Sequence, residues 1–489
     1  MDWLLIALLI VPFVGAAAAL VARPPAAETT TLAAGIAAFA LAVVAAVHVR
    51  HGATLLILDG WLRLDSLGAV FLLATGLLYA SGAVFSIGYL RADEHRRDYA
   101  PFARRYFVYL NLFAWTMLLI PAVNDFGMLW IAVELTTIVS ALLVALDRTD
   151  AALEAAWKYV LIASAGLGIA LIGVILLYAA GTGPLGTGYL PRFSSYLAVA
   201  GSLPAGAVKV AFLLAAIGFG TKAGFAPLHT WLPDAHSEAP TPVSALLSGA
   251  LLVNAFYAIL RFFQVTVAVD GSAFPRHVLL VLGTASLLIA ALYVLSQRSY
   301  KRLLAYSSIE HIGVIALGVG FGAPIAVAGA LLHVINHAAA KGLAFFGAGS
   351  ILRRFDTKEI DDVSGAWSVL PWSGPLFLGA ALALSGIPLS GIFRSEFQIV
   401  AGGFAQPEYV WVALLIVVVN VAFFGVVWNL GRMVLTPSRE DVQRGETSWW
   451  MVAAMVACAV VVVGLGLHVP TGLSQLLHSA AAQLTNPTR

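Results

Sequence analysis

The sequence predicts an all-α polytopic membrane protein with about 14 transmembrane helices, arranged as two inverted five-helix repeats that each contain a broken helix. Of its 489 residues, 61% are hydrophobic and only 11% are charged, whereas a soluble domain carries about 25% charged residues. These polar side chains are too few to cover a water-soluble protein of this length. The apolar residues also gather in runs of about 20 residues, the length that crosses a bilayer.

The apolar runs follow one another along the whole chain and leave no room for a soluble domain. Even the longest polar connections are too short to bury a core of their own; they lie near 91–106, 181–205, 353–371 and 435–448. In chain order, the predicted spans are 3–22, 30–48, 66–89, 107–123, 125–146, 157–180, 206–226, 241–263, 277–296, 303–322, 324–350, 373–401, 409–434 and 449–470.

Two of the spans contain residues that interrupt a helix. Gly224 and Pro227 fall where one helix would be expected to continue, and Gly386, Pro388 and Gly391 fall inside another span. Proline removes a backbone donor and clashes with the preceding turn, and in lipid the freed carbonyl groups need other partners. For either span taken alone, an ordinary proline kink is the alternative interpretation.

The two interruptions stand at matching positions, because each lies in the fourth span of a five-span unit. Paired interruptions of this kind are typical of transporters built from inverted repeats. We therefore divide the chain into N-terminal helices at 1–106, a first inverted repeat at 107–263, a second inverted repeat at 277–434, and a C-terminal loop with the last helix at 435–489.

Lysine and arginine are divided unevenly between alternate connections. The richer side is expected to be cytoplasmic, and an even number of spans then places both termini outside the cytoplasm. The richer set includes Arg91, Arg96, Arg148, Arg298, Arg302 and Arg353, whereas the other set holds only Arg50, Arg63, Arg192 and Arg276.

Charge and cysteine content exclude several classes of function. The net charge is only +2, and a nucleic-acid partner would need concentrated basic charge. Cys458 is the single cysteine, so the chain cannot hold an internal disulfide, an Fe–S cluster or a cysteine-rich zinc site. The glycine-rich stretch at 318–322 lies inside an apolar span and is not a nucleotide loop. We expect no cofactor in this chain.

Ionisable residues inside the spans carry the functional signal. A charge at the centre of a spanning helix costs about 2.5–3.5 kcal/mol on insertion scales, so a chain that keeps several gains a function from them. Glu134 lies in the middle of its span, and Lys222 lies at the first helix break. A lysine and a carboxylate that approach and separate can pass a proton. The alternative is a static buried ion pair, which often adds no net stability.

His333, His337 and Lys341 occur four residues apart on one predicted helix. This spacing places the three groups on one helix face over roughly 12 Å, and histidine is suited to passing protons near neutral pH. A polar packing network is one alternative. A metal site is another, although the H-E-x-x-H glutamate is missing and no third ligand stands close in the sequence.

Three further sets of residues extend the predicted pathway. Glu310 and His311 are placed near the start of their span, as a proton inlet or an interfacial cap. His229 and His236 flank a proline-rich loop that is expected to give protons access to the broken helix; a metal cluster is the alternative there. Glu396, just beyond the second break, is predicted to end the row.

The segment 221–250, TKAGFAPLHTWLPDAHSEAPTPVSALLSGA, resembles the antiporter-like proton-translocating subunit family. Its members are the L-, M- and N-type subunits of complex I, the large subunits of multi-subunit cation/proton antiporters, and matching subunits of group 4 hydrogenases. The similarity extends to 62–73, 85–90, 333–342 and 386–397. Glu310 before His311, together with the modest length, resembles the F subunit of hydrogenase-4 and formate hydrogenlyase-type complexes.

The resemblance implies a proton-translocating subunit in a prokaryotic-type inner membrane. Glu134 and Lys222 match the family's switch pair, and Lys341 and Glu396 continue the row, with Glu396 similar to the M-type group. It also implies a hydrophilic redox module and other membrane subunits as partners, with Ni–Fe, Fe–S or quinone cofactors only in those partners. Several relatives carry another lysine in the next span, where this chain offers only Val253 or Asn254.

Three other functions remain open at this point. A subunit of a multi-subunit Na⁺/H⁺ antiporter would use the same helices but would be driven by ion gradients. An energy-coupling subunit of a non-redox complex, such as one for inorganic carbon uptake, would use them for other chemistry. A passive scaffold is disfavoured, because it would gain nothing from buried ionisable groups.

Overall fold

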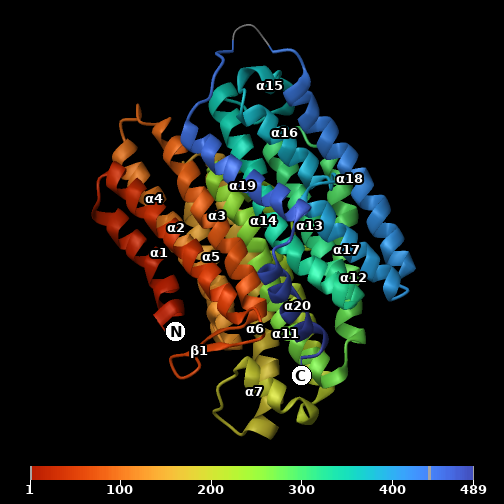
Figure 1. Ribbon diagram of the computed structural model, residues 1–489. Coiled ribbons are helices and arrows are strands. Elements are labelled where there is room, and N and C mark those ends of the chain that lie inside the picture. Colours follow the sequence, from red (N-terminus) through yellow and green to blue (C-terminus); the bar gives the residue numbers. More distant parts are fainter. Residues whose placement is uncertain (1–2, 439–441, 488–489) are drawn as a thin grey trace.

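The protein is a bundle of long helices that run side by side (Figure 1). The computed structural model describes residues 3–438 and 442–487. Among these, eleven helices are long and apolar enough to cross a membrane. The remaining predicted spans correspond to α4 (Tyr99–Leu119), α14 (Pro324–Phe355) and the pair α16 (Ser373–Leu384) and α17 (Gly391–Ala405). The prediction of an all-α, multi-pass membrane protein is therefore confirmed.

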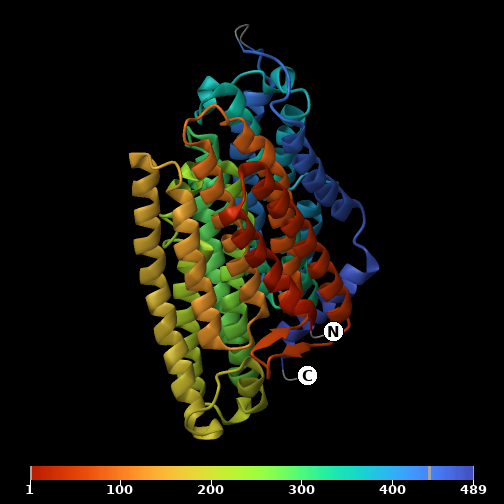
Figure 2. The same cartoon turned by 90° about the vertical axis from the view of Figure 1, so that its left-hand side faces the viewer.

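The other spanning helices follow the predicted order. They are α1 (Trp3–Val21), α2 (Pro24–Val49), α3 (Ser66–Arg91), α5 (Phe126–Val144), α6 (Asp150–Leu185), α8 (Ala205–Ala223), α10 (Thr241–Leu246) continuing through a π-helical turn (Leu247–Leu251) into α11 (Leu252–Asp270), α12 (Ala273–Val294), α13 (Tyr300–Phe321), α18 (Tyr409–Leu435) and α19 (Trp449–Leu467). The helix α6 forms one edge of the bundle in the view of Figure 2.

Several boundaries differ from those predicted. The span predicted at 107–123 is the helix α4, which begins at Tyr99 because Phe102, Ala103 and Tyr106 are buried despite the arginines between them. A short 3₁₀ turn at Ile120–Ala122 separates α4 from α5. The predicted spans at 107–123 and 125–146 are therefore two separate helices.

Several short elements were not predicted. The strands β1 (Leu55–Ile57) and β2 (Leu62–Leu64) form an antiparallel hairpin, and α7 (Phe193–Ala198) follows α6. The helix α20 (Thr471–Thr485) follows α19 and buries Leu477, Ala481 and Leu484 on one face. With only 15 residues and an apolar stripe rather than an apolar surface, α20 lacks the features that mark a span.

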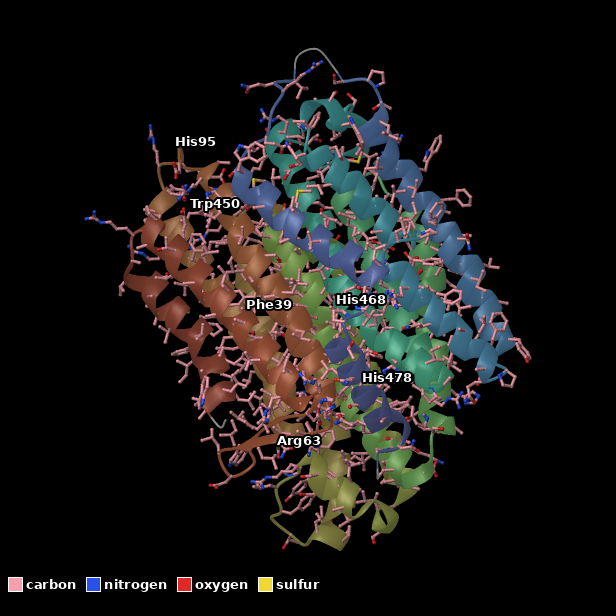
Figure 3. The ribbon with its side chains drawn as sticks, viewed as in Figure 1. Phe39, Arg63, His95, Trp450, His468 and His478 are labelled. Carbon is pink, nitrogen blue, oxygen red and sulfur yellow. The ribbon has the colours of Figure 1, made fainter. Side chains whose placement is uncertain are left out.

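Both chain ends lie at the end of the bundle that carries the β-hairpin and α7 (Figure 1). The short helix α15 (Ala366–Val369) lies at the opposite end. Arg63 and His95 mark these two ends in Figure 3. This arrangement agrees with an even number of membrane crossings.

Both predicted helix interruptions are present. The helix α8 ends at Ala223, Gly224 takes a left-handed φ of +87°, and α9 (Leu232–Glu238) continues the chain. In the second break, Gly386 has a φ of +69°. The hydroxyl of Ser390 then caps α17 by accepting a hydrogen bond from the backbone N–H of Phe393 at 3.1 Å. Pro227 and Pro388 lie within these two breaks.

The helices α6 and α8 pack with almost no space between their backbones at Gly218, and this contact holds the first broken helix in place. A Cβ atom added at Gly218 would lie 2.4 Å from the backbone nitrogen of Ala170. We expect Gly218→Ala to lower the free energy of unfolding by about 1–3 kcal/mol through overpacking. Gly206→Ala on the same helix is the control, since its Cβ would meet nothing within 4 Å. Thermal unfolding in detergent measures both; equal melting temperatures would contradict this account of the contact.

Candidate functional site

A row of polar side chains runs through the apolar interior from α5 to α17. Lys222, Asn254, His337 and Lys341 are completely buried. The row begins at Glu134 and contains His333 and His311 before it ends at Glu396. Both terminal carboxylates are only partly buried. The predicted row is therefore assembled from six helices, and it approaches the surface at its two ends.

The predicted switch pair does not form an ion pair in this structure. The ammonium of Lys222 donates to the Thr137 hydroxyl at 2.7 Å and also to the hydroxyl of Tyr159. The Glu134 carboxylate instead accepts from the Ser164 hydroxyl on α6 at 2.9 Å. Thr137 lies one helical turn after Glu134, so a change of side-chain conformation is enough to bring the two charges together.

Tyr159 is a residue of this site that the sequence did not indicate. Its ring is fully buried, and its hydroxyl lies 2.7 Å from the hydroxyl of Ser140. The ring packs on Trp231 with centroids 4.5 Å apart, and the Trp231 indole donates to the carbonyl of Thr221 at 2.9 Å. Tyr159 therefore fixes both the lysine ammonium and the backbone beside it. A tyrosine in an apolar span is usually a packing residue, so its role could not be recognised from the sequence.

Tyr159→Phe should slow the proton transfer expected of this row by about ten- to a hundredfold, because the ammonium loses a charge-assisted hydrogen bond of about 1.5–3 kcal/mol. The protein's melting temperature should change little, since the ring remains. Tyr196→Phe is the matched control: Tyr196 is equally buried and shares a hydrogen bond with the Tyr189 hydroxyl, away from the row. Proton uptake into vesicles containing the reconstituted complex measures the rate. An unchanged rate in Tyr159→Phe would exclude this positioning role.

The middle of the row has no lysine. Several relatives carry one there, whereas this chain offers only Val253 or Asn254. The amide of Asn254 donates to the Thr75 hydroxyl at 2.9 Å, and its Oδ1 atom is buried with no hydrogen-bond partner among the described residues. Just before it, the π-helical turn leaves the Ser248 carbonyl free to lie 3.2 Å from His337 Nε2. Such turns often occur at functional sites.

Serine hydroxyls connect this neutral stretch to Lys341. Ser248 and Ser308 share a hydrogen bond of 2.6 Å. The Lys341 ammonium donates to the Ser307 hydroxyl at 2.5 Å and to the Leu304 carbonyl at 3.0 Å. The Ser308 hydroxyl also donates to the Leu304 carbonyl at 3.0 Å, so Ser248 and Lys341 are linked through Ser308 and this carbonyl.

The placement of Glu310 and His311 near the start of a span was wrong. The helix α13 begins at Tyr300, so both residues are buried about three turns inside it. The ring of His311 lies against α14, with its Nδ1 atom 3.0 Å from Nε2 of His333. His333 Nδ1 in turn lies 2.9 Å from the Ser395 hydroxyl on α17. The sequence missed Ser395 because its role depends on how α17 packs.

His229 and His236 lie in and after the first break. His236 is fully buried on α9, with Nδ1 2.8 Å from the Leu232 carbonyl and its ring between Trp231 and Phe345. His229 packs against Tyr306 on α13. Neither His229 Nδ1 nor His236 Nε2 has a hydrogen-bond partner among the described residues. Neither ring belongs to a group of side chains that could hold a metal ion among the described residues. Their role as a proton inlet stays a prediction.

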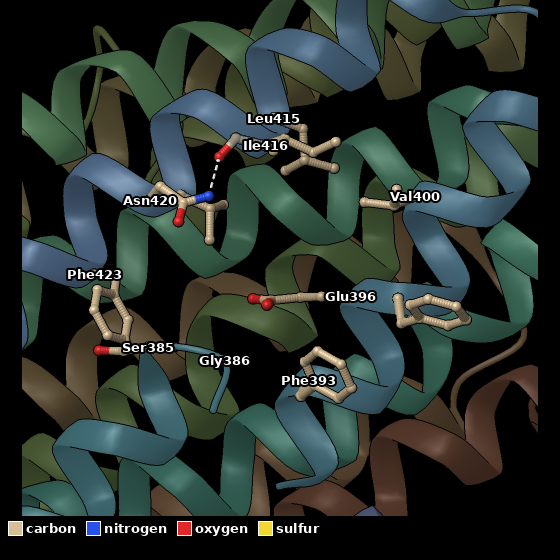
Figure 4. Close-up of a pocket in the computed structure, with 11 residues that line it drawn as sticks. Ser385, Gly386, Phe393, Glu396, Val400, Leu415, Ile416, Asn420 and Phe423 are labelled. Carbon is tan, nitrogen blue, oxygen red and sulfur yellow. Dashed lines mark hydrogen bonds between the residues drawn. The ribbon is translucent and has the colours of Figure 1, made fainter. Parts of the chain in front are cut away.

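Glu396 extends from α17 into a cavity of about 290 Å³ beside the second break (Figure 4). Ser385 and Asn420 provide polar atoms to the cavity, whereas Phe393 and Phe423 make its walls largely aromatic. Arg394 does not pair with Glu396; it donates to the carbonyl of Leu467 on α19 at 3.3 Å.

A multi-pass bundle with two broken helices and a buried row of lysine, histidine and glutamate residues defines an ion-translocating membrane protein. Comparison with known proteins agrees with this class. Residues 123–425 match the family described as NADH:quinone oxidoreductase/Mrp antiporter, TM, and the chain belongs to this family.

The chain is 36% identical over 375 residues to the hydrogenase-4 component F homolog of Methylacidiphilum infernorum, covering 76% of this chain and 77% of that protein. It is 32% identical over 351 residues to hydrogenase-4 component B of Escherichia coli, covering 69% of this chain but only 50% of that longer protein. The fold is similar to a chain of the Mrp complex from Dietzia sp., with a TM-score of 0.87, 22% identity, and 99% and 98% of the two chains covered.

Proposed function

We propose that this chain is a proton-translocating membrane subunit of a complex I-like or group 4 membrane-bound hydrogenase complex. The observation that carries the proposal is the row of ionisable and polar groups in the apolar interior from Glu134 to Glu396. Similarity to hydrogenase-4 components supports the choice of complex. The chain moves protons, and the redox chemistry that drives them takes place in partner subunits.

The relay begins with a change of charge near Glu134. Electron transfer in a partner alters the electrostatic potential at this end of the row, and the Glu134 carboxylate turns from Ser164 toward Lys222. A carboxylate beside the ammonium favours its charged form, and withdrawal of the carboxylate favours release of the proton. The released proton then passes through hydroxyl groups to Lys341 and the histidines, and leaves at Glu396.

Partner subunits are expected against both ends of the row. Exposed apolar side chains surround the partly buried carboxylates: Ile131 and Ile138 flank Glu134, and Phe397 is 64% exposed beside Glu396. We propose a hydrophilic redox module beyond these membrane subunits, with any Ni–Fe, Fe–S or quinone group held there. The lysine and arginine distribution supports a cytoplasmic α15 end, with both termini on the outer side of an inner membrane.

A subunit of a Na⁺/H⁺ antiporter is the second candidate, because the family description includes the Mrp antiporter and the Mrp chain has the same fold. Purification of the tagged native complex in mild detergent, followed by identification of its subunits, separates the two. A hydrogenase-like or complex I-like hydrophilic module is the expected result. Recovery of small membrane subunits alone would overturn the redox proposal in favour of ion exchange.

A further inference from the structure

Three side chains that could bind a metal ion meet at the outer part of the row, although they come from different helices. They are His311 on α13, His333 on α14 and Glu396 on α17. One ligand atom from each lies within 4.8 Å of the other two. Two imidazoles and one carboxylate are a ligand set that zinc and related transition metals accept in proteins. This set could not be recognised from the sequence, because its successive members are 22 and 63 residues apart.

The distances suit a metal ion with small adjustments of the side chains. Nδ1 of His311 and Nε2 of His333 are 3.0 Å apart. Two nitrogen ligands on a tetrahedral zinc ion, each at about 2.0–2.1 Å from the metal, are about 3.3 Å apart. The imidazoles must therefore rotate slightly, and the flexible Glu396 side chain must move its carboxylate toward them.

A supporting residue already orients one of the rings. The Ser395 hydroxyl lies 2.9 Å from Nδ1 of His333, which leaves Nε2 to face His311 and the proposed ion. Hydrogen bonds to the second nitrogen of a ligand histidine are a regular feature of metal sites. In addition, Nε2 of His311 is buried with no hydrogen-bond partner among the described residues.

The site can be reached through the cavity beside Glu396. This cavity of about 290 Å³ opens at the surface of the bundle and has Ser385, Asn420 and the Glu396 carboxylate on its walls. Its volume exceeds that of several waters at about 30 Å³ each, so a hydrated ion can enter it and reach the carboxylate first.

We propose that His311, His333 and Glu396 form a binding site for a divalent transition-metal ion of the zinc class, with water as a fourth ligand. The bound ion occupies the same nitrogen and oxygen lone pairs that the row needs for protons. Micromolar zinc therefore blocks proton transfer by closing the end of the row. His337 stays outside the site, because its Nε2 atom is directed to the Ser248 carbonyl.

The test uses the full-length chain, purified in detergent and freed of metal, with Co²⁺ as a spectroscopic probe. We expect one Co²⁺ per chain with the visible absorption of a four-coordinate ion, and competition by Zn²⁺. Glu396→Gln and His333→Gln should weaken binding at least tenfold. Ser395→Ala, which keeps all three ligands, should weaken it about 10- to 100-fold. His478→Gln, at an exposed histidine on α20 (Figure 3), should change nothing.

Two results would overturn the proposal. One is Co²⁺ binding that is equal in the original chain and in Glu396→Gln, which would mark adventitious binding at the surface. The other is an absorption spectrum of six-coordinate Co²⁺ only. Native electrophoresis verifies that each variant is folded. If a variant of a ligand residue does not fold, Ser395→Ala still tests the proposal. Because binding is measured directly, the outcome does not depend on the proposed proton transfer or its energy source.

Discussion

Lys222→Ala is expected to abolish proton transfer while the complex remains assembled. Lys222 is the only charged residue between Glu134 and Lys341 in the row described above, and its ammonium is held by Thr137 and Tyr159 at the end of α8. Alanine offers no group that can bind and release a proton there. The hydroxyl groups that remain can conduct a proton but cannot store one.

The measurement is proton uptake into vesicles that contain the purified complex, driven by its own electron donor. Native electrophoresis of the same preparations shows whether the complex is intact. Lys209→Ala is the matched control, because Lys209 stands on the same helix but forms a surface ion pair with Asp270 at 2.7 Å. Normal proton uptake in Lys222→Ala would exclude the proposed relay, and equal losses in both variants would point to a general defect of α8.

Arg261→Met should destabilise the fold by about 3–5 kcal/mol, because it leaves the Asp65 carboxylate buried without its main partner. The two residues form an ion pair of 2.7 Å in which the side chains are only 2% and 1% exposed. Asp65 also caps α3 by accepting from the backbone N–H of Gly68 at 3.0 Å, so the pair joins the start of α3 to α11.

Thermal unfolding in detergent tests this prediction against a surface pair. Arg96 and Asp98 are 31% and 55% exposed, and Arg96→Met should cost about 0–1 kcal/mol. The double variant Asp65→Asn with Arg261→Met removes both charges while keeping a side chain that can cap α3. It should be more stable than Arg261→Met alone. If Arg261→Met unfolded at the same temperature as Arg96→Met, the buried pair would not hold these helices together.

Much of the fold could be predicted because lipid imposes a simple requirement on length and polarity. Every predicted span corresponds to a helix or a broken pair of helices, and the breaks at Gly224 and Gly386 follow from residues that cannot continue a helix. The boundary of α4 was missed because arginines alternate with buried aromatic residues there. The helix α20 was missed because its apolar surface is a narrow stripe.

The candidate site likewise contains residues that the sequence indicates and residues that it does not. Ionisable residues such as Lys222 and Lys341 are visible in a sequence because they are costly in an apolar span. Their partners are not visible, since the roles of Tyr159 and Ser395 depend on which helices pack together. The meeting of His311 with His333 likewise depends on the contact between α13 and α14. The spacing of residues in the sequence predicts which side chains share a face of one helix, whereas these contacts join side chains from several helices.

The neutral side chain of Asn254 separates the two lysines of the row, Lys222 and Lys341. In the proposed relay each lysine binds one proton in turn, and the stretch around Asn254 carries no charge of its own. Because the surroundings are poor in water, a charge on one lysine raises the energy of a like charge on the other. The proposed relay therefore charges the two lysines in alternation, so that a change of charge at one edge of the protein releases a proton at the other edge.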